Sequence, residues 1–471
     1  MERLLAMYEH HEDQILQSLN NNRIEHRIKA SSGLWLGVLV GFSAAVTLLR
    51  EDNSYSEICL ITGVTGFGLV ICCICLYLRL AVDKTAAKDF QVIYFLPAIM
   101  TSMLYLYIAN KGLLISVIWG LSVATLGTWG VLQLMSTFPQ CFTIGEATAV
   151  MHAFVLFLMS AVANLPLRYH LPPIHSNDIA TVILQVGTLY AIALCLLCGY
   201  FPILRPPKYF YSLTITLLVC VILPILYLIL DQNPITWVLQ FVFGSSSKIL
   251  LFTYWAGCLC ICTLLIIYYT SGNCQATTVT RKSFHLLAVF VYIPGLICDP
   301  ALLYLASGII FALFILIELI RFLTIPPLGI ELQKTFSLFA DEKDVLLSLT
   351  PLYLLCGLSI PLWMPRTNMP LLPLLSGVLT VGIGDTAASF VGSKWGSHKW
   401  PSSDKSVEGT LACIFSQVSL ILGLACMGYL NSGWLLIRSL LASVAISFIE
   451  ARTNQVDNLA LPLLMYTCLT I

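Results

Sequence analysis

The sequence has very little charge. Of its 471 residues, 58% are hydrophobic and only 10% are charged, and Lys plus Arg equal Asp plus Glu at 24 each. A soluble protein of this composition would have too little polar surface to stay dissolved, so we predict a polytopic helical membrane protein. The zero net charge gives no indication of a nucleic-acid partner.

Several common functional motifs are also missing. The sequence has no N-x-S/T glycosylation acceptor, no Walker A loop and no H-R-D or D-F-G kinase signature. Its 17 cysteines lie mostly inside apolar runs such as VICCICLYL, and no C-x-x-C array has histidines nearby. We therefore interpret the cysteines as small hydrophobic residues rather than as zinc ligands or disulfides.

Long apolar runs are what the sequence has in abundance. They predict an all-α transmembrane bundle of about 15 spans, with a range of about 13–15. The expected spans are 31–49, 56–78, 90–109, 112–135, 148–165, 178–200, 210–230, 250–270, 284–298, 300–324, 345–363, 370–392, 409–430, 433–449 and 457–471. We divide the chain into a cytosolic N-terminal segment (1–30), an N-terminal transmembrane region (31–270) and a C-terminal transmembrane domain (271–471).

The basic residues predict the orientation of these spans. If every span crosses, the side that holds the N-terminus carries 18 of the 24 basic residues and the other side carries 5, with Arg438 inside a span. By the positive-inside rule, the side with the N-terminus is expected to be cytosolic.

Four polar clusters of the C-terminal domain fall on this cytosolic side: 280–285, 339–344, 393–408 and 450–458. Either cytosolic loops are simply longer and more charged, or the four loops assemble one site. The second interpretation adds these polar residues to the site: Arg281, Lys282, Asp341, Glu342, Lys343, Asp344 and Asn458. In the preceding half, we interpret TFPQCFTIGEA (137–147) as a turn.

Asp385 is unusual because it lies inside an apolar run. On a helix it shares a face with Ala388, Ser389, Gly392 and Gly396, a stripe of small residues that lets a helix or a ligand approach closely. A carboxylate within the membrane needs a partner, a metal ion or water. The stripe therefore indicates either helix packing with a structural Asp–Lys pair or a functional carboxylate.

The loop after Asp385 is rich in glycine, serine and lysine, which suit phosphate binding. Four helices are expected to begin at the cytosolic face, where their positive ends favour an anion. Asp344, Ser406 and Asp457 are candidate N-caps for them, which is a purely structural role. The carboxylates nearby would repel a polyanion unless a divalent cation intervened, so the pattern predicts a Mg²⁺–nucleoside triphosphate site.

These motifs together resemble a known family. GIGDTAASFVGSKWG, KWPSSDKSVEGT and EARTNQVDNLALPL are similar to the C-terminal domain of dolichol kinases, and RKSFHLLAV and FADEKD occur in the expected order. The resemblance covers about residues 280–470, whereas the first half matches in hydrophobic character alone. It implies an enzyme of the endoplasmic-reticulum membrane that phosphorylates dolichol with CTP and supplies the lipid carrier for glycosylation.

The resemblance also implies a CTP-binding segment at 391–406, followed by a K-x-x-E-G-T element. These residues are Val391, Gly392, Ser393, Lys394, Trp395, Gly396, Ser397, His398, Lys399, Trp400, Pro401, Ser402, Ser403, Asp404, Lys405, Ser406, Glu408, Gly409 and Thr410. The three lysines are the expected phosphate contacts. The run SHKWPSSDKS is less basic than the family pattern, because Asp404 adds a negative charge.

The implied catalytic groups are carboxylates. The family's acidic residue falls on Asp385, which we expect, with Asp457 or Glu450, to hold Mg²⁺ or another divalent cation or to take the hydroxyl proton. His285 is either a proton acceptor or phosphate contact, or an interfacial hydrogen-bonding residue. The tryptophans of the loop could stack on cytosine, but tryptophan is common at membrane interfaces and we favour that role.

Two other functions stay open at this point. Another CTP-using lipid enzyme, such as a phytol or diacylglycerol kinase or a phosphatidate cytidylyltransferase, would use a similar site. A transporter would be expected to place charges near the membrane midplane and to contain repeats, whereas here the charges gather at one face.

Overall fold

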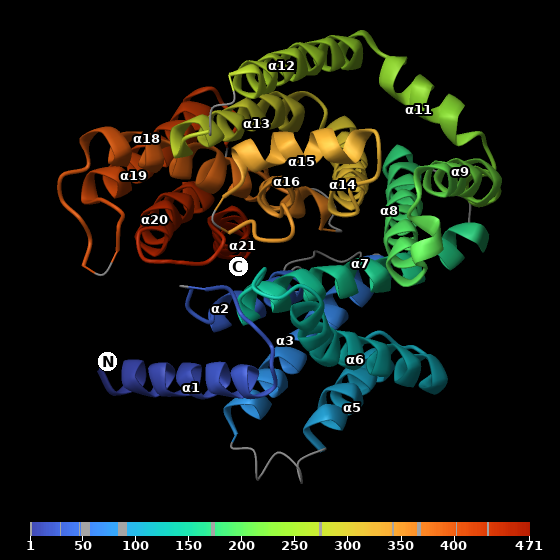
Figure 1. Cartoon of the computed structure of the whole chain (residues 1–471), viewed down its shortest axis with the longest axis horizontal. Coiled ribbons are helices and arrows are strands. Elements are labelled where there is room, and N and C mark those ends of the chain that lie inside the picture. The colour runs from blue at the N-terminus through green and yellow to red at the C-terminus, as the bar shows by residue number, and fades with distance from the viewer. Residues whose placement is uncertain are drawn as a thin grey trace. The chain divides into compact units, whose positions relative to one another are not determined.

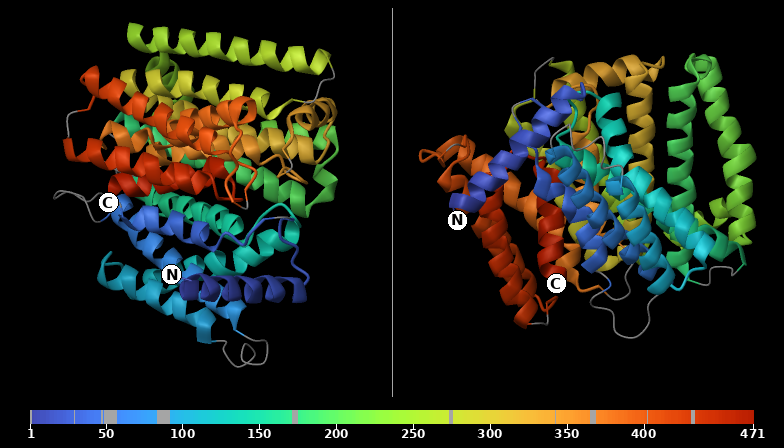
Figure 2. Two further views of the ribbon diagram at one scale, coloured as in Figure 1. Left: turned by 90° about the vertical axis from the view of Figure 1, so that its left-hand side faces the viewer. Right: turned by 90° about the horizontal axis from the view of Figure 1, so that it is seen from below.

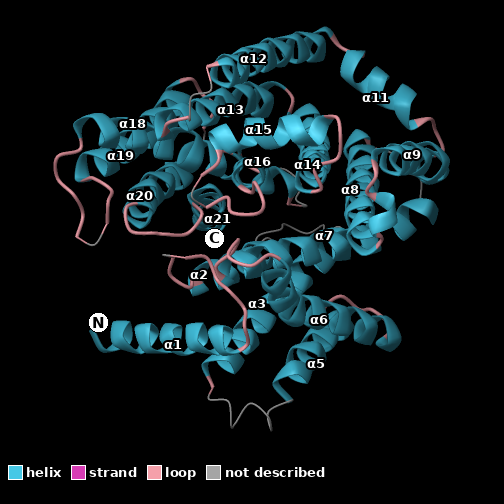
Figure 3. Cartoon of the chain, viewed as in Figure 1, coloured by secondary structure: helices cyan, strands magenta, loops and turns pink. Residues whose placement is uncertain are grey.

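The computed structural model describes residues 2–28, 30–46, 48, 57–82, 92–170, 175–272, 276–341, 343–364, 369–401, 403–430 and 433–471. Within these ranges the regular structure is helical, and the described chain has no β-strand (Figure 3). An isolated antiparallel bridge joins Lys399 and Ser406. The predicted all-α class is confirmed.

The chain divides into two compact units. The first contains Met1–Ala163, Met364–Asn368 and Thr453–Ile471, and the second contains Asn164–Trp363 and Met369–Arg452. The functional division at residue 270 stays a prediction.

The first unit contains the helices of both chain ends (Figure 1). They are α1 (Glu2–Asn21), α2 (Leu34–Val46), α3 (Glu57–Ala81), α5 (Val92–Tyr107), α6 (Leu113–Thr137), most of α7 (Ile144–His170) and α21 (Asp457–Thr470). Glycines bring α2 and α3 into backbone contact, since a Cβ at Gly66 would lie 2.6 Å from the Gly41 carbonyl oxygen. A buried hydrogen bond of 2.9 Å between Ser43 and Thr467 joins α2 to α21.

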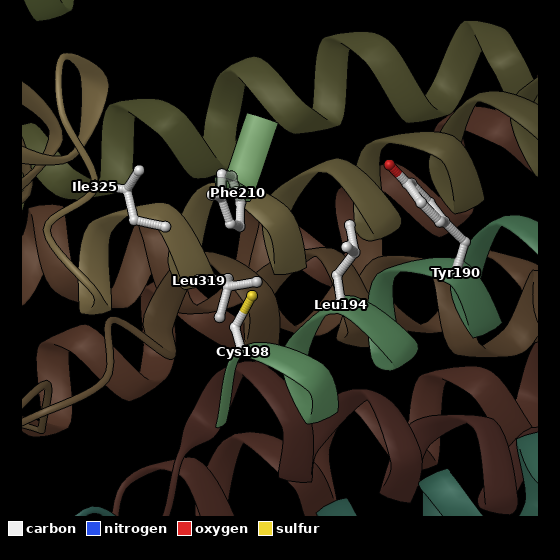
Figure 4. Close-up of a cluster of buried hydrophobic side chains, with 6 residues drawn as sticks. All are labelled: Tyr190, Leu194, Cys198, Phe210, Leu319 and Ile325. Atoms are coloured by element: carbon white, nitrogen blue, oxygen red, sulfur yellow. The ribbon is translucent and has the colours of Figure 1, made fainter. Parts of the chain in front are cut away.

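The second unit contains α8 (Ser176–Tyr200), α9 (Pro207–Leu217), α10 (Leu223–Leu230), α11 (Pro234–Phe243), α12 (Ser246–Ser271), α13 (Thr278–Cys298), α14 (Pro300–Phe322), α15 (Leu328–Phe339), α16 (Thr350–Trp363), α17 (Leu371–Leu374), α18 (Thr386–Trp395), α19 (Val407–Cys426) and α20 (Gly433–Glu450). A buried cluster packs α8 against α9 and the end of α14. Its members are Tyr190, Leu194, Cys198, Phe210, Leu319 and Ile325 (Figure 4). Helix α12 lies along the edge of this unit (Figure 2).

Ten stretches in the described part of the chain are long and apolar enough to cross a membrane. One of them, Pro207–Leu230, joins α9 and α10 through the π-helical turn Leu218–Ile222. Each predicted span overlaps a described helical stretch, but several of these stretches are short, so the exact count stays a prediction. Helices α11 and α15 were not among the predicted spans.

A buried ion pair closes the last turn of α14. Arg321 donates to both carboxylate oxygens of Glu318, at 2.7 and 2.6 Å. The guanidinium also donates to the Gln333 side chain on α15 and to the Leu346 carbonyl, and Glu318 accepts from the Ser348 amide. No sequence motif indicated this pair, which connects α14, α15 and the segment that leads into α16.

Replacing Arg321 with methionine would leave the Glu318 carboxylate buried without its counter-ion. We expect the unfolding free energy to fall by about 3 kcal/mol, measured by denaturant titration in mixed micelles. The control is Lys334→Met, which removes an exposed pair of the same i,i+3 spacing with Glu331. This control should cost less than about 0.5 kcal/mol, and equal losses in the two variants would contradict the prediction.

Candidate active site

Asp385 lies at the junction of two helical forms. It ends the π-helical segment η4 (Val378–Asp385), and α18 continues directly from it. Wide π-helical turns are rare and frequently occur at functional sites. The sequence predicted a helix here but not the widened turn. The Asp385 side chain is buried, with 3% of the residue exposed.

Helix α13 supplies the nearest charged partner of Asp385. Lys282 forms an ion pair with Asp385 Oδ2, and His285, about one helical turn further, places Nδ1 3.8 Å from the same oxygen. On α18, Ser389 Oγ lies 3.5 Å from Oδ1. The His285 Nδ1 atom is buried and has no hydrogen-bond partner among the described residues. The predicted cluster 280–285 therefore meets Asp385, and the Asp–Lys pair of the structural interpretation is present.

A second carboxylate lies close to Asp385. Glu450 ends α20, and one of its oxygens lies within 4.8 Å of an Asp385 oxygen. Lys405 donates to Glu450 Oε1 at 2.6 Å and to the Glu450 carbonyl at 2.7 Å. Two buried carboxylates thus lie side by side, each with its own lysine. Closely spaced carboxylate oxygens are the ligands that divalent cations such as Mg²⁺ prefer.

The predicted CTP-binding loop folds as a short hairpin. Its two sides are joined by hydrogen bonds from the Trp400 amide to the Lys405 carbonyl and from the Val407 amide to the His398 carbonyl. The Trp400 indole donates to Thr410 Oγ1 at 2.9 Å and packs edge-on against Phe448. Trp400 therefore attaches the hairpin to α19 and α20.

The small-residue stripe packs α18 against the start of α19. A Cβ at Gly409 would lie 2.9 Å from the Ala388 carbonyl oxygen, and a Cβ at Gly396 would lie 2.5 Å from Ser406 Oγ. Gly392 faces the same hydroxyl. The close approach predicted for this stripe is confirmed, and the element that approaches is the first turn of α19.

The three candidate N-caps have different outcomes. Ser406 caps α19 by accepting from the Gly409 amide at 3.1 Å, as predicted. Asp344 accepts from the Leu349 and Thr350 amides at the start of α16, at 2.8 and 3.0 Å. The prediction for Asp457 is wrong, because Val456 occupies the N-cap position and Asp457 is the first residue of α21.

Glu408 connects the hairpin to α19. Its carboxylate accepts from Ser397 Oγ at 2.7 Å and from the His398 backbone amide, and it pairs with His398 Nδ1 at 2.6 Å. These contacts involve Glu408 in holding the loop together. Its role toward CTP, implied by the family resemblance, stays a prediction.

The lysines of the loop differ in their availability. Lys394 and Lys399 are exposed; Lys394 lies over the Trp395 ring and Lys399 donates to the Asp404 carbonyl. Lys405 is already engaged by Glu450. Trp395 is 57% exposed, consistent with an interfacial position. The same segment contains Val391, Ser393 and Pro401. Ser393 Oγ donates to the Phe390 carbonyl, and Ser403 Oγ donates to the Ala451 carbonyl.

The remaining predicted residues fall in three places. Arg281 pairs with Asp341 at 2.9 Å, and Lys343 is half-buried in the segment before α16. Glu342 and Ser402 lie outside the described residues. Asp457 and Asn458 begin α21 in the first unit, and their part in this site stays a prediction.

The helices and the paired buried charges define a multi-pass membrane protein with a polar site of lysines and carboxylates. The family described as "Dolichol kinase" matches residues 56–350 of the chain. Human dolichol kinase is 37% identical over 358 residues, which cover 70% of this chain and 65% of the human protein. The chain belongs to the dolichol kinase family.

Relatives outside animals carry the same name. Dolichol kinase EVAN of Arabidopsis thaliana is 38% identical over 251 residues, covering 51% of this chain and 44% of the plant protein. Dolichol kinase of Saccharomyces cerevisiae is 29% identical over 245 residues, covering 50% and 45%. The chain thus spans 65% or less of these relatives. No solved structure matches it.

The α18–α19 contact gives a direct test of the stripe. Gly409→Val would push side-chain atoms against the Ala388 carbonyl, and we expect a loss of about 1–3 kcal/mol in unfolding free energy. Gly423→Val is the matched control, because a Cβ at Gly423 on the same helix meets nothing within 4 Å. The two variants should differ clearly in denaturant titration; equal stability would show that α18 and α19 are not in close contact.

Proposed function

We propose that this chain is a CTP-dependent dolichol kinase of the endoplasmic-reticulum membrane. It would transfer the γ-phosphate of CTP to the dolichol hydroxyl and so supply dolichyl phosphate for glycosylation. The observation that carries the proposal is the convergence of Lys282, Asp385 and the Glu450–Lys405 pair, from four separate motifs, in a member of the dolichol kinase family.

The proposed reaction needs positioning and charge neutralisation more than covalent chemistry. The dolichol oxygen attacks the γ-phosphorus, the bond from that phosphorus to the β–γ bridging oxygen breaks, and CDP leaves. Asp385 has two alternative roles: it takes the hydroxyl proton, or it holds a cation and the proton passes to His285, whose Nδ1 lies 3.8 Å from Asp385 Oδ2. Lys394 and Lys399 are available on the hairpin surface to neutralise phosphate charge.

A divalent cation, Mg²⁺ in the first place, fits the donor set of this site. Asp385 and Glu450 would hold it, because both carboxylates are buried and their oxygens lie within 4.8 Å of one another. Asp457 is a further candidate ligand from the family motif. The bound cation would neutralise phosphate charge. Lys282 and Lys405 pair with the two carboxylates in the structure and compensate their charge.

Asp385→Asn tests the proposed centre. In detergent-solubilised membranes given dolichol and γ-³²P-CTP, we expect the wild type to label dolichyl phosphate and the variant to lose at least about 100-fold in rate. The control is Glu331→Gln, which alters an exposed carboxylate of α15 and should leave the rate unchanged.

Parallel reactions identify the donor and the group transferred. Label from γ-³²P-ATP in place of CTP would contradict the proposed donor. Label from α-³²P-CTP in the lipid would indicate cytidylyl transfer instead of a kinase reaction. A wild type that moves no γ-phosphate from CTP would overturn the proposal.

The proposed cytosolic orientation has its own test. Because the chain has no N-x-S/T acceptor, an inserted one reports lumenal exposure without background. An acceptor on a flexible linker between α11 and α12 should be glycosylated, and one between α12 and α13 should not. The opposite pattern would place the site on the lumenal side.

A further inference from the structure

A buried carboxylate at the start of α7 has two distinct sets of contacts. Glu146 is fully buried in the first unit. Its Oε2 accepts from the Thr143 amide at 3.0 Å, and Thr143 Oγ1 accepts from the Glu146 amide at 3.2 Å. This reciprocal pair is a capping box, which satisfies two backbone donors at the helix end. The local role involves only one of the two carboxylate oxygens.

The other oxygen binds residues that are far away in the sequence. Glu146 Oε1 accepts from the Val456 amide at 3.0 Å and pairs with Arg27 Nη2 at 2.8 Å. The same Arg27 nitrogen donates to the Asn454 carbonyl at 2.9 Å. Glu146 and Arg27 therefore hold the backbone on both sides of Gln455, immediately before α21 begins at Asp457.

The Gln455 side chain completes this arrangement, which we name the α21 clamp (Arg27, Glu146 and Gln455). It is 1% exposed, accepts from Thr143 Oγ1 at 2.7 Å and donates to the Ser31 carbonyl at 2.9 Å. Gly33 makes room for it: its φ is +69°, and a Cβ there would lie 2.2 Å from Gln455 Oε1. A left-handed glycine therefore faces the amide without conformational strain.

Stability alone is a poor explanation for the clamp. A buried ion pair generally stabilises a fold no better than apolar side chains of similar volume. What charged hydrogen bonds add is geometry, because they fix the direction and register of the backbone groups that they bind. The backbone fixed here is the segment from which Asp457 and Asn458 extend.

We propose that Arg27, Glu146 and Gln455 are positioning residues that set the start of α21, so that Asp457 and Asn458 can act in phosphate transfer. This inference rests on the proposed function. It assigns a role to the stretch 137–147, which the sequence pattern predicted to be a turn.

Two variants test the clamp while leaving the capping box in place. Arg27→Met removes the bonds to Glu146 Oε1 and the Asn454 carbonyl, and Gln455→Leu removes those to Thr143 and Ser31. We expect kcat with CTP to fall by about 10- to 100-fold at an unchanged KM for dolichol, as for a misplaced group. Hydrogen exchange of a peptide spanning 453–460 should become faster.

Two further variants separate positioning from general destabilisation. Ser43→Ala removes a buried hydrogen bond to the far end of α21, at Thr467, and should leave kcat and exchange at 453–460 unchanged. Arg27→Lys keeps the positive charge and should recover part of the kcat that Arg27→Met loses. A variant that merely weakened the fold would make exchange faster throughout the protein and not at 453–460 in particular.

The outcomes separate this proposal from the one on which it rests. A wild type that moves no γ-phosphate from CTP would overturn the proposed function. A wild type that moves it, with Arg27→Met and Gln455→Leu equal to it in kcat, would overturn the clamp alone, whether or not exchange becomes faster. Reduced kcat in both variants with faster exchange would support it.

Discussion

The structure depends on compensating charges in a medium that does not solvate them. An isolated carboxylate in an apolar environment costs several kcal/mol or more, so it persists only with a partner. Each buried carboxylate considered above has one: Asp385 pairs with Lys282, Glu450 with Lys405, Glu318 with Arg321, and Glu146 with Arg27. Because a partner must lie at a set distance and direction, each pair constrains the local geometry as well as compensating a charge.

The ion pairs differ in the segments that they connect. Glu318 and Arg321 come from one helical turn, and their remaining hydrogen bonds connect that turn to α15 and to the segment before α16. The pairs around Asp385 and Glu450 join elements that are distant in the sequence and leave two carboxylates adjacent. Under the proposed function, a bound cation would replace the lysines as the partner of these two carboxylates.

Close backbone approach is the second condition for this arrangement. The stripe that begins at Asp385 has small residues at each turn, and Gly409 of α19 packs against it. The hairpin between the two helices therefore starts and ends at nearly the same place. The π-helical turn before Asp385 changes the direction of the side chains that follow it. The family match at 56–350 includes Lys282 and His285 of this site, whereas Asp385, Lys405 and Glu450 lie beyond it.

The sequence by itself determined the helical class, the approximate place of the apolar helices and the polar clusters from which the partners of Asp385 come, because apolar run length, glycine spacing and charge are local properties of the chain. It also determined the α19 cap at Ser406. Only the tertiary structure decided which lysine pairs with which carboxylate, that Trp400 attaches the hairpin to α19 and α20, and that Glu146 binds the backbone before α21. These contacts join residues up to several hundred positions apart, and a helical period relates only neighbours three or four residues away, so no local pattern contains that information.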